Sequence, residues 1–170
     1  MKKKYIVLAG ISGILIALDQ IVKIYVHTHF LLGESISVIK GFFNITYVRN
    51  PGAAFGFLAE SHPAFREIFF LAMPPVALLI ILLILRGVDD DDYLQTISLS
   101  SVFGGAIGNY IDRIRFRYVI DFLDFHVNET WTYPAFNIAD SAIVVGVIIL
   151  LILMFLEEKN KKTQKVATSN

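Results

Sequence analysis

The sequence lacks cysteine and has little charge: its 170 residues include no Cys, 15 Lys and Arg, and 15 Asp and Glu. Without cysteine the chain cannot form disulfides, thiolate nucleophiles, iron–sulfur clusters or zinc sites built from thiolates. The even balance of charge argues against a nucleic-acid partner. Hydrophobic residues make up 55% of the chain. This excess indicates a membrane protein whose chemistry depends on oxygen or imidazole groups.

The apolar residues gather in four runs, each about as long as a bilayer core is thick. They are residues 5–25, 69–85, 94–111 and 138–156. The second run contains Pro74 and Pro75, which kink a helix without preventing its insertion. The third is rich in serine and glycine, so we expect the other three helices to shield it from lipid. The predicted fold is a mainly α membrane protein with four transmembrane helices.

Basic residues flank the first and last runs and set the expected orientation. Lys2, Lys3 and Lys4 precede the first run, and four lysines lie between positions 159 and 165, after the last. By the positive-inside rule, both termini are expected in the cytoplasm. We expect residues 1–158 to form one membrane-embedded domain and the polar tail, 159–170, to be disordered.

Two β-rich segments lie outside the four runs. The first, within residues 30–60, contains SISVI (35–39) and FNITYV (43–48), which are split by a Lys-Gly pair and closed by an Asn-Pro-Gly turn signal. The second, residues 115–125, alternates with period two over residues 115–122 and predicts a further strand. Together they predict a small extracytoplasmic β-sheet. Trp131, Tyr133 and Phe136 follow, and we expect them at the membrane interface.

Three acidic residues lie where a carboxylate is costly, so each is a functional candidate. Asp19 lies inside the first run, four residues before Lys23 on the same helical face, which predicts an ion pair in a supporting role. These charges also distinguish the run from a cleavable signal peptide. Asp140, in the first turn of the fourth run, is either functional or a helix cap. Asp121 lies between two apolar neighbours, and Asp124 is the alternative to it in the same strand.

Other chemistry has weaker support. The four histidines form no His-Glu-x-x-His pattern, so no metal site is predicted. Asp112 and Arg113 are compatible with a simple charge pair at the interface. Gly104, Gly105 and Gly108, taken alone, are compatible with close helix packing.

Three blocks follow one another between residues 104 and 141: GGAIGNYIDR (104–113), VIDFLDF (119–125) and FNIADS (136–141). With the earlier NPGAAF (50–55) and the Asp19-Gln20 pair followed by Lys23, they resemble the lipoprotein signal peptidases. This family, also called signal peptidase II, consists of bacterial membrane aspartyl proteases. The resemblance covers nearly the whole chain and leaves out only the tail.

The resemblance implies a function and a site. Asp121 and Asp140 would be the two catalytic aspartates, and the residues that shape the site or hold substrate would be Asn50, Gly105, Asn109, Arg113, Asn137, Asp19 and Lys23. The substrate would be the signal peptide of a prolipoprotein, cleaved before a cysteine that carries diacylglycerol. The family also implies sensitivity to the cyclic peptide globomycin, no cofactor, and a catalytic domain in the bacterial cytoplasmic (inner) membrane with its site at the outer face.

The chemistry of two carboxyl groups fits this function on its own terms. A close pair shares one proton, so one carboxylate can act as general base on water while the other carboxyl protonates the carbonyl oxygen and then the leaving amine. A rival hypothesis is a four-span transport component in which intramembrane aspartates bind ions or relay protons. A lipid-binding scaffold with purely structural carboxylates is a third.

The segment around the Asn-Pro-Gly turn is predicted to be part of the substrate site. The turn fixes the backbone at residues 50–52, and the small Ala53 and Ala54 let it approach a ligand closely. Phe55 and Phe57 offer apolar surface at the depth where acyl chains begin. The alternative is a plain connection with incidental aromatic residues.

Overall fold

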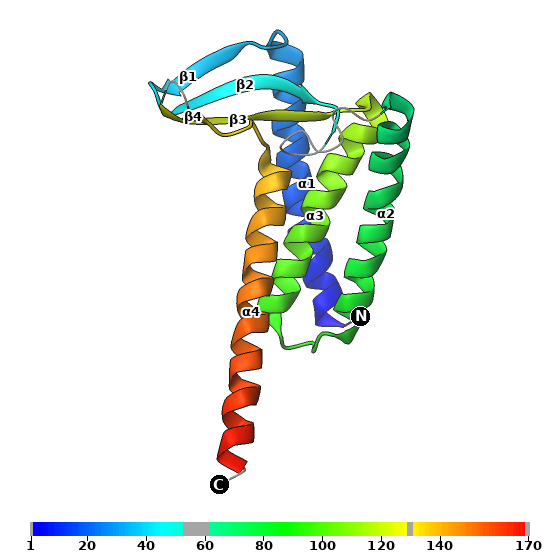
Figure 1. Cartoon of the computed structure of the whole chain (residues 1–170). Coiled ribbons are helices and arrows are strands. Elements are labelled where there is room, and N and C mark those ends of the chain that lie inside the picture. Colours follow the sequence, from blue (N-terminus) through cyan, green and yellow to red (C-terminus); the bar gives the residue numbers. More distant parts are fainter. Residues whose placement is uncertain (1, 53–61, 129–130, 169–170) are drawn as a thin grey trace.

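The computed structural model describes residues 2–52, 62–128 and 131–168. Its helices are α1 (Lys3–His29), α2 (Pro63–Gly87), α3 (Tyr93–Phe116) and α4 (Ile138–Thr168). A small sheet lies across one end of the helices, and the N- and C-termini lie at the other end (Figure 1). The prediction of a mainly helical protein with a small sheet is confirmed.

Three of the helices are long and apolar enough to cross a membrane: Lys3–His29, Ala64–Gly87 and Ile138–Lys162. The third predicted span, α3, is not among them. Its serine and glycine residues lower its hydropathy, and Ser98, Ser100, Gly104, Gly105 and Gly108 are buried. The helix packs against α1, α2 and α4, as expected for a polar helix that its neighbours shield.

Glycines let the neighbouring helices approach α3 closely. A Cβ atom added at Gly105 would clash with the Ala139 carbonyl oxygen of α4, and one at Gly104 would lie 2.9 Å from the Ser12 Cα atom of α1. At such separations a side chain would force the backbones apart. These glycines therefore have the packing role that the sequence left open.

The sheet has four antiparallel strands in the order β1 (Ser35–Ile39), β2 (Phe43–Asn50), β3 (Val119–Asn128) and β4 (Trp131–Thr132). The predicted 35–39 and 43–48 strands and the added third strand are thus confirmed. Val48 of β2 pairs with Asp121 of β3. The chain leading into α4 also bonds to β3, because the Phe136 N–H donates to the Leu123 carbonyl at 3.0 Å. This connection brings the start of α4 beside Asp121.

The strand predicted for residues 115–125 begins later than expected. Residues 115 and 116 complete the last turn of α3, which ends at Arg117 in a left-handed conformation with φ of 65°. The Arg117 N–H donates to the Arg113 carbonyl at 3.1 Å, which closes the helix. The period-two alternation of residues 115–118 therefore falls on a helix end, and the prediction is wrong there.

The tail also differs from the expectation of disorder. α4 continues to Thr168, so residues 159–168 are helical. The Lys161 Nζ atom lies 2.8 Å from the Glu157 carboxylate, and the Lys162 Nζ atom lies 2.6 Å from the Glu158 carboxylate. In each pair the two residues are four positions apart on the helix. Pairs at this spacing stabilise an exposed helix, which a reading of overall polarity does not register.

Two apolar cores occupy opposite ends of the molecule. At the end with the termini, Leu8, Ile81, Leu85, Val88 and Leu99 join α1, α2 and α3. Under the sheet, Val26, Tyr47, Ile120 and Phe122 join α1 to β2 and β3. The second core packs the sheet against α1 and so fixes the position of β3 relative to the helices.

Candidate active site

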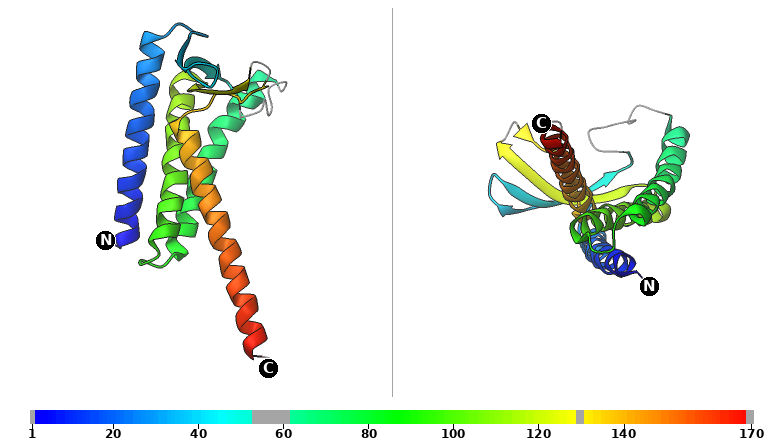
Figure 2. Two further views of the ribbon diagram at one scale, coloured as in Figure 1. Left: turned by 90° about the vertical axis from the view of Figure 1, so that its left-hand side faces the viewer. Right: turned by 90° about the horizontal axis from the view of Figure 1, so that it is seen from below.

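A cleft of about 1350 Å³ lies between the helices and the sheet. Both α2 and α4 pack against α3, and they stand apart from each other when the bundle is viewed from the end (Figure 2). The walls formed by α2, α3 and α4 include the apolar residues Met73, Pro74, Ala77, Ala106, Ile143 and Val144. The polar lining is concentrated at the sheet end, where Asn50, Asn109, Arg113, Asp121 and Asp140 meet.

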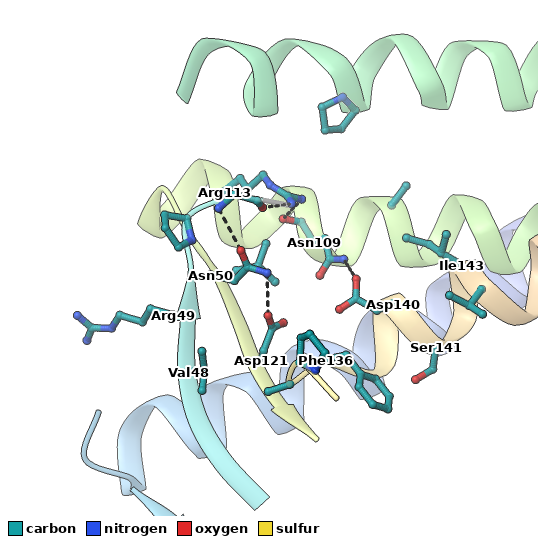
Figure 3. Close-up of a pocket in the computed structure, with 18 of the residues that line it drawn as sticks. Val48, Arg49, Asn50, Asn109, Arg113, Asp121, Phe136, Asp140, Ser141 and Ile143 are labelled. Atoms are coloured by element: carbon teal, nitrogen blue, oxygen red, sulfur yellow. Dashed lines mark hydrogen bonds between the residues drawn. The ribbon is translucent and has the colours of Figure 1, made fainter. Parts of the chain in front are cut away.

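Asp121 and Asp140 reach this cleft from different elements (Figure 3). Asp121 lies on β3 and is 1% exposed, whereas Asp140 lies in the first turn of α4. The Asp121 carboxylate accepts hydrogen bonds from the side-chain amides of Asn50 (3.0 Å) and Asn137 (2.7 Å). The structure thus brings the two predicted catalytic aspartates to one place.

The Asp140 carboxylate is held by two donors. The Asn109 side-chain amide donates to Oδ1 at 2.7 Å, and the Asn137 backbone N–H donates to Oδ2 at 3.2 Å. The Asp140 N–H in turn donates to the Asn137 Oδ1 atom at 2.9 Å. This reciprocal arrangement caps the start of α4, so Asp140 caps the helix and also faces the cleft.

Asn137 connects the two carboxylates. Its side-chain Nδ2 donates to Asp121, while its backbone N–H donates to Asp140. The same Nδ2 lies 3.1 Å from the Asn109 Oδ1 atom, which closes a network of uncharged amides around the pair. Asn137 is fully buried, so this network is shielded from water and its hydrogen bonds are strong.

The electrostatic environment favours a protonated carboxyl group. Burial raises the pKa of the Asp121 carboxyl to about 7, and the nearby Asp140 carboxylate adds to the rise. The amide donors of Asn50 and Asn137 oppose this shift. A pair with such a raised pKa keeps one proton near neutral pH.

Arg113 supplies positive charge beside the pair. Its guanidinium lies 5.2 Å from the centre of the Phe70 ring, which ties α3 to α2. It also lies within 3.4 Å of two backbone carbonyl oxygens, those of Asn109 and Gly52. Arg113 therefore holds the Asn-Pro-Gly turn over the cleft, a contact that the sequence alone could not reveal.

The ion pair predicted between Asp19 and Lys23 is present at 2.8 Å. Lys23 also lies 3.0 Å from the Asp112 carboxylate and donates to the Asn109 Oδ1 atom at 2.9 Å. Asp112 is fully buried and is not the interface charge pair that its neighbour Arg113 suggested. It is a supporting residue that sequence reasoning missed. The polar Gln20 inside the apolar first run, which donates to it at 2.9 Å, was a signal that the run faces a polar partner.

The remaining candidates lie at or beyond the rim of the cleft. Gly105 lies at the contact of α3 with α4 and does not line the cleft. Asn50 both donates to Asp121 and accepts from the Gly52 N–H at 3.0 Å, so the turn positions it. Ala53, Ala54, Phe55 and Phe57 lie outside the described residues.

Asp124 does not join the pair. Its carboxylate lies 2.8 Å from the His126 Nε2 atom, and the Asn44 side chain lies 2.8 Å from the same ring nitrogen. In the described part of the chain, no group of three or more His, Cys, Asp or Glu residues is arranged to hold a metal. Tyr133 and Phe136 line the cleft, and the Trp131 side chain lies outside the described part, so the membrane-interface prediction stays a prediction.

Fold and site together define a multi-pass membrane enzyme with a carboxylate pair at one end of an apolar cleft. Solved structures of a bacterial membrane enzyme, obtained by the in meso method, have the same fold. One, at 2.3 Å resolution, has a TM-score of 0.78 and 31% identity, and the match covers 91% of this chain and 90% of that one. Another, at 1.9 Å, has a TM-score of 0.74 and 30% identity over 86% of this chain and 91% of that one.

Sequence comparison identifies the particular family. Residues 11–156 match the family described as Signal peptidase (SPase) II. A lipoprotein signal peptidase of Syntrophus aciditrophicus is 48% identical over 161 residues, which are 95% of this chain and 99% of that protein. One of Geobacter metallireducens is 44% identical over 95% of this chain and 98% of that protein. The chain belongs to the signal peptidase II family.

Proposed function

We propose that the protein is an aspartyl endopeptidase that removes the signal peptide from diacylglyceryl-modified prolipoproteins, cleaving before the lipidated cysteine. The observation that carries this proposal is the bridge made by Asn137, which donates to Asp121 and to Asp140 within one apolar cleft. Family membership supports the same substrate. Neither the family nor the related structures support the transport alternative.

In the proposed mechanism the two carboxyl groups share one proton. The ionised member takes a proton from the attacking water, and the protonated member gives its proton to the scissile carbonyl oxygen. The amine leaves with a proton returned by the pair. The surrounding amides, Asn50, Asn109 and Asn137, orient both carboxylates without adding a charge that would lower their proton affinity.

The shape of the cleft supports a lipid-embedded substrate. Its apolar part lies between α2 and α4 and contains Met73, Ala77 and Val144, so a helical signal peptide can enter from the side without leaving the bilayer. The scissile peptide would then reach the polar end, and the diacylglyceryl chains would remain in lipid. A globomycin-type cyclic peptide would compete for the same polar end.

We place α3 as a fourth spanning helix, because the three apolar helices that surround it are themselves candidate spans. Both termini lie at the end away from the sheet (Figure 1), which agrees with the lysine-flanked termini lying in the cytoplasm. The sheet and the aspartates then lie at the outer face of the cytoplasmic membrane. Residues 1–158 act as one catalytic domain in this arrangement.

The test is a cleavage assay with the purified protein in lipid nanodiscs. The substrate is a synthetic signal peptide whose lipobox cysteine carries diacylglycerol, and the matched control peptide carries an unmodified cysteine. We expect cleavage before the lipidated cysteine only, inhibited by globomycin and unaffected by EDTA. Absence of cleavage by the wild-type protein, or a requirement for added metal, would overturn the proposed function.

A further inference from the structure

Lys23 is one of two buried lysines in α1, and it lies between two carboxylates. Its Nζ atom is 2.8 Å from the Asp19 carboxylate and 3.0 Å from the Asp112 carboxylate, and all three side chains are 1% exposed. None of the three lines the cleft. Such a cluster is expensive to bury, and it does not contact the space where substrate would bind.

The two carboxylates hold the backbone next to the catalytic pair. The second Asp19 oxygen accepts the backbone N–H of Ala139 at 2.9 Å. Asp112 accepts the backbone N–H of Ile120 at 3.0 Å. Ala139 immediately precedes Asp140, and Ile120 immediately precedes Asp121. One ammonium group is therefore connected, through two carboxylates, to the residue before each member of the pair.

Lys23 also sets the orientation of Asn109. An ammonium group can only donate, so the Asn109 atom that faces it at 2.9 Å must be the side-chain oxygen. The Asn109 amide nitrogen is then directed at Asp140, to which it donates at 2.7 Å. The Asn137 Nδ2 atom donates to the same Asn109 oxygen at 3.1 Å, so the ammonium group is one of two donors that fix this orientation, and its loss weakens the hold on the Asn109 amide.

Gly108 provides the room that this arrangement needs. A Cβ atom at Gly108 would lie 2.7 Å from the nearer Asp19 oxygen and 3.2 Å from the Ala139 Cβ atom. Asp19 can therefore cross from α1 to the start of α4 only where α3 has no side chain. The contact is a specific fit of three helices around one carboxylate.

We propose that Lys23 is a positioning residue that, together with Asp19 and Asp112, sets the separation of Asp121 and Asp140. β3 and α4 come from different parts of the fold, and this cluster gives them one common anchor on α1 and α3. The inference rests on the proposed function, because separation matters only if the two carboxyl groups act as a pair.

A merely structural role is separated from positioning by a matched control. Lys4 is the other buried lysine of α1, at the opposite end, where it donates to the carbonyls of Arg86 and Val88. Lys23→Met and Lys4→Met each remove one buried ammonium from the same helix. Only Lys23→Met removes a contact leading to the catalytic pair.

Steady-state cleavage of the diacylglyceryl lipobox peptide gives the first readout. We expect Lys23→Met to lower kcat about 100-fold with KM within about threefold, since a small misplacement of reacting groups has an effect of this size. The limbs of its pH profile should also move, because the interaction between the two carboxyls depends on their separation and because the Lys23 charge itself lowers the pKa of Asp121; the fall in kcat at the pH optimum of each variant therefore carries the positioning test. Lys4→Met should keep kcat within about threefold at equal amounts of folded protein. Equal losses in the two variants would overturn the proposal.

Hydrogen exchange gives a readout that does not depend on activity. In wild-type protein the Ile120 and Ala139 N–H groups should be protected, and in Lys23→Met both should exchange at least about tenfold faster, while the helix interiors of α2 and α4 do not change. If the wild-type protein cleaves no peptide, the proposed function fails and this measurement still tests the anchor. Unchanged exchange at both amides would overturn the positioning role.

Amide substitutions keep the test decisive if Lys23→Met does not fold. Asp112 presents one oxygen to both Lys23 and Ile120, so an Asn oxygen can replace it there. The cost falls on Gln20, whose amide donates to the other Asp112 oxygen and to the Gly108 carbonyl and is not part of the anchor. Asp19 presents one oxygen to Lys23 and the other to Ala139, so an Asn must point a donor at a donor. We expect Asp112→Asn to keep kcat within about tenfold and Asp19→Asn to lose more than that. The reverse order would overturn the anchor.

Discussion

The two ends of α1 each bury one lysine, but in opposite surroundings. At the end with the termini, Lys4 donates to two backbone carbonyls beside an apolar core. At the sheet end, Lys23 lies among the carboxylates of Asp19 and Asp112. Lys4 thus closes the end of α2 as any suitable donor might, whereas the groups around Lys23 extend to both proposed catalytic aspartates.

The difference shows which end of the molecule buries charges that lower its stability. Buried ion pairs are often no more stable than apolar residues of the same volume, because removing charges from water costs several kcal/mol per ion. At the end with the termini, Lys4 is the one buried charged residue among those described. The sheet end buries Asp19, Lys23, Asp112, Asp121 and the polar Asn137. The buried charges at the sheet end therefore serve the proposed active site, whereas the end with the termini is stabilised by apolar packing. The predictions below test that division, from the largest effect to the smallest.

The largest effect is expected at the carboxylate pair. Asp121→Asn and Asp140→Asn should each reduce cleavage by at least about 10³-fold, because an amide retains the shape but cannot exchange the proton. Membrane insertion and folding should be retained, since each Asn can still accept one of the hydrogen bonds. Cleavage is followed by mass spectrometry of the peptide products. An active Asp121→Asn variant would remove Asp121 from the pair.

The pH dependence should follow the pair as a unit. With the pKa of Asp121 raised to about 7 by burial, activity should fall about tenfold per pH unit above that value as the shared proton is lost. The profile of kcat/KM between pH 4 and 9 should therefore be a bell. Constant activity from pH 7 to 9 would contradict a shared proton.

The same shift predicts a change in stability. Because the pKa of Asp121 rises on folding from 3.8 to about 7, the folded state binds the proton more tightly than the unfolded state does. The contribution of Asp121 to the free energy of unfolding is therefore full below about pH 4 and is lost as the pH rises through 7. Denaturation at several pH values should show this fall in wild-type protein, and Asp121→Asn should flatten it.

Asn50→Ala should have an intermediate effect at the rim. The substitution removes the donor to Asp121 and the acceptor of the Gly52 N–H, so we expect kcat to fall about tenfold or more with normal expression. Wild-type kinetics for Asn50→Ala, together with tolerance of Ala54→Leu, would show that the turn only connects helices.

A packing change far from the pair should affect stability but not catalysis. A Cβ atom at Gly146 would lie 2.7 Å from the Ser98 carbonyl oxygen, whereas one at Gly10 would have no neighbour within 4 Å. Gly146→Ala should therefore lower the free energy of unfolding by about 1–3 kcal/mol, and Gly10→Ala should not lower it. Thermal unfolding measures both. A large loss of kcat per folded molecule in Gly146→Ala would blur the division between the two ends.

The smallest effect is expected at Asp124. This carboxylate pairs with His126 and lies outside the cleft lining, so Asp124→Asn should keep cleavage within about threefold of wild type. A dead Asp124→Asn variant beside an active Asp121→Asn variant would mean that the pair had been assigned to the wrong residue of β3.

Sequence patterns were sufficient for features that repeat locally. The four apolar runs each fall on a helix, and three of these helices are candidate spans, because length and hydropathy are properties of single segments. Alternation predicted β1 and β2. The i, i+4 spacing was enough for the Asp19–Lys23 pair. Alternation failed at residues 115–118, where Arg117 closes α3 in a left-handed conformation. The end of a helix depends on local backbone geometry, which the period of hydrophobic residues does not show.

By itself the sequence determined which groups were available, since a chain without cysteine must use oxygen or imidazole groups, and its carboxylates in apolar surroundings favour acid–base catalysis over ion binding or a purely structural role. Only the tertiary structure decided which groups work together. The bridge from Asn137 to both aspartates, and the contacts of Asp19 with Ala139 and Asp112 with Ile120, join residues separated by as many as 120 positions. Such contacts depend on how α1, α3, β3 and α4 pack, and the packing is set by all four elements together.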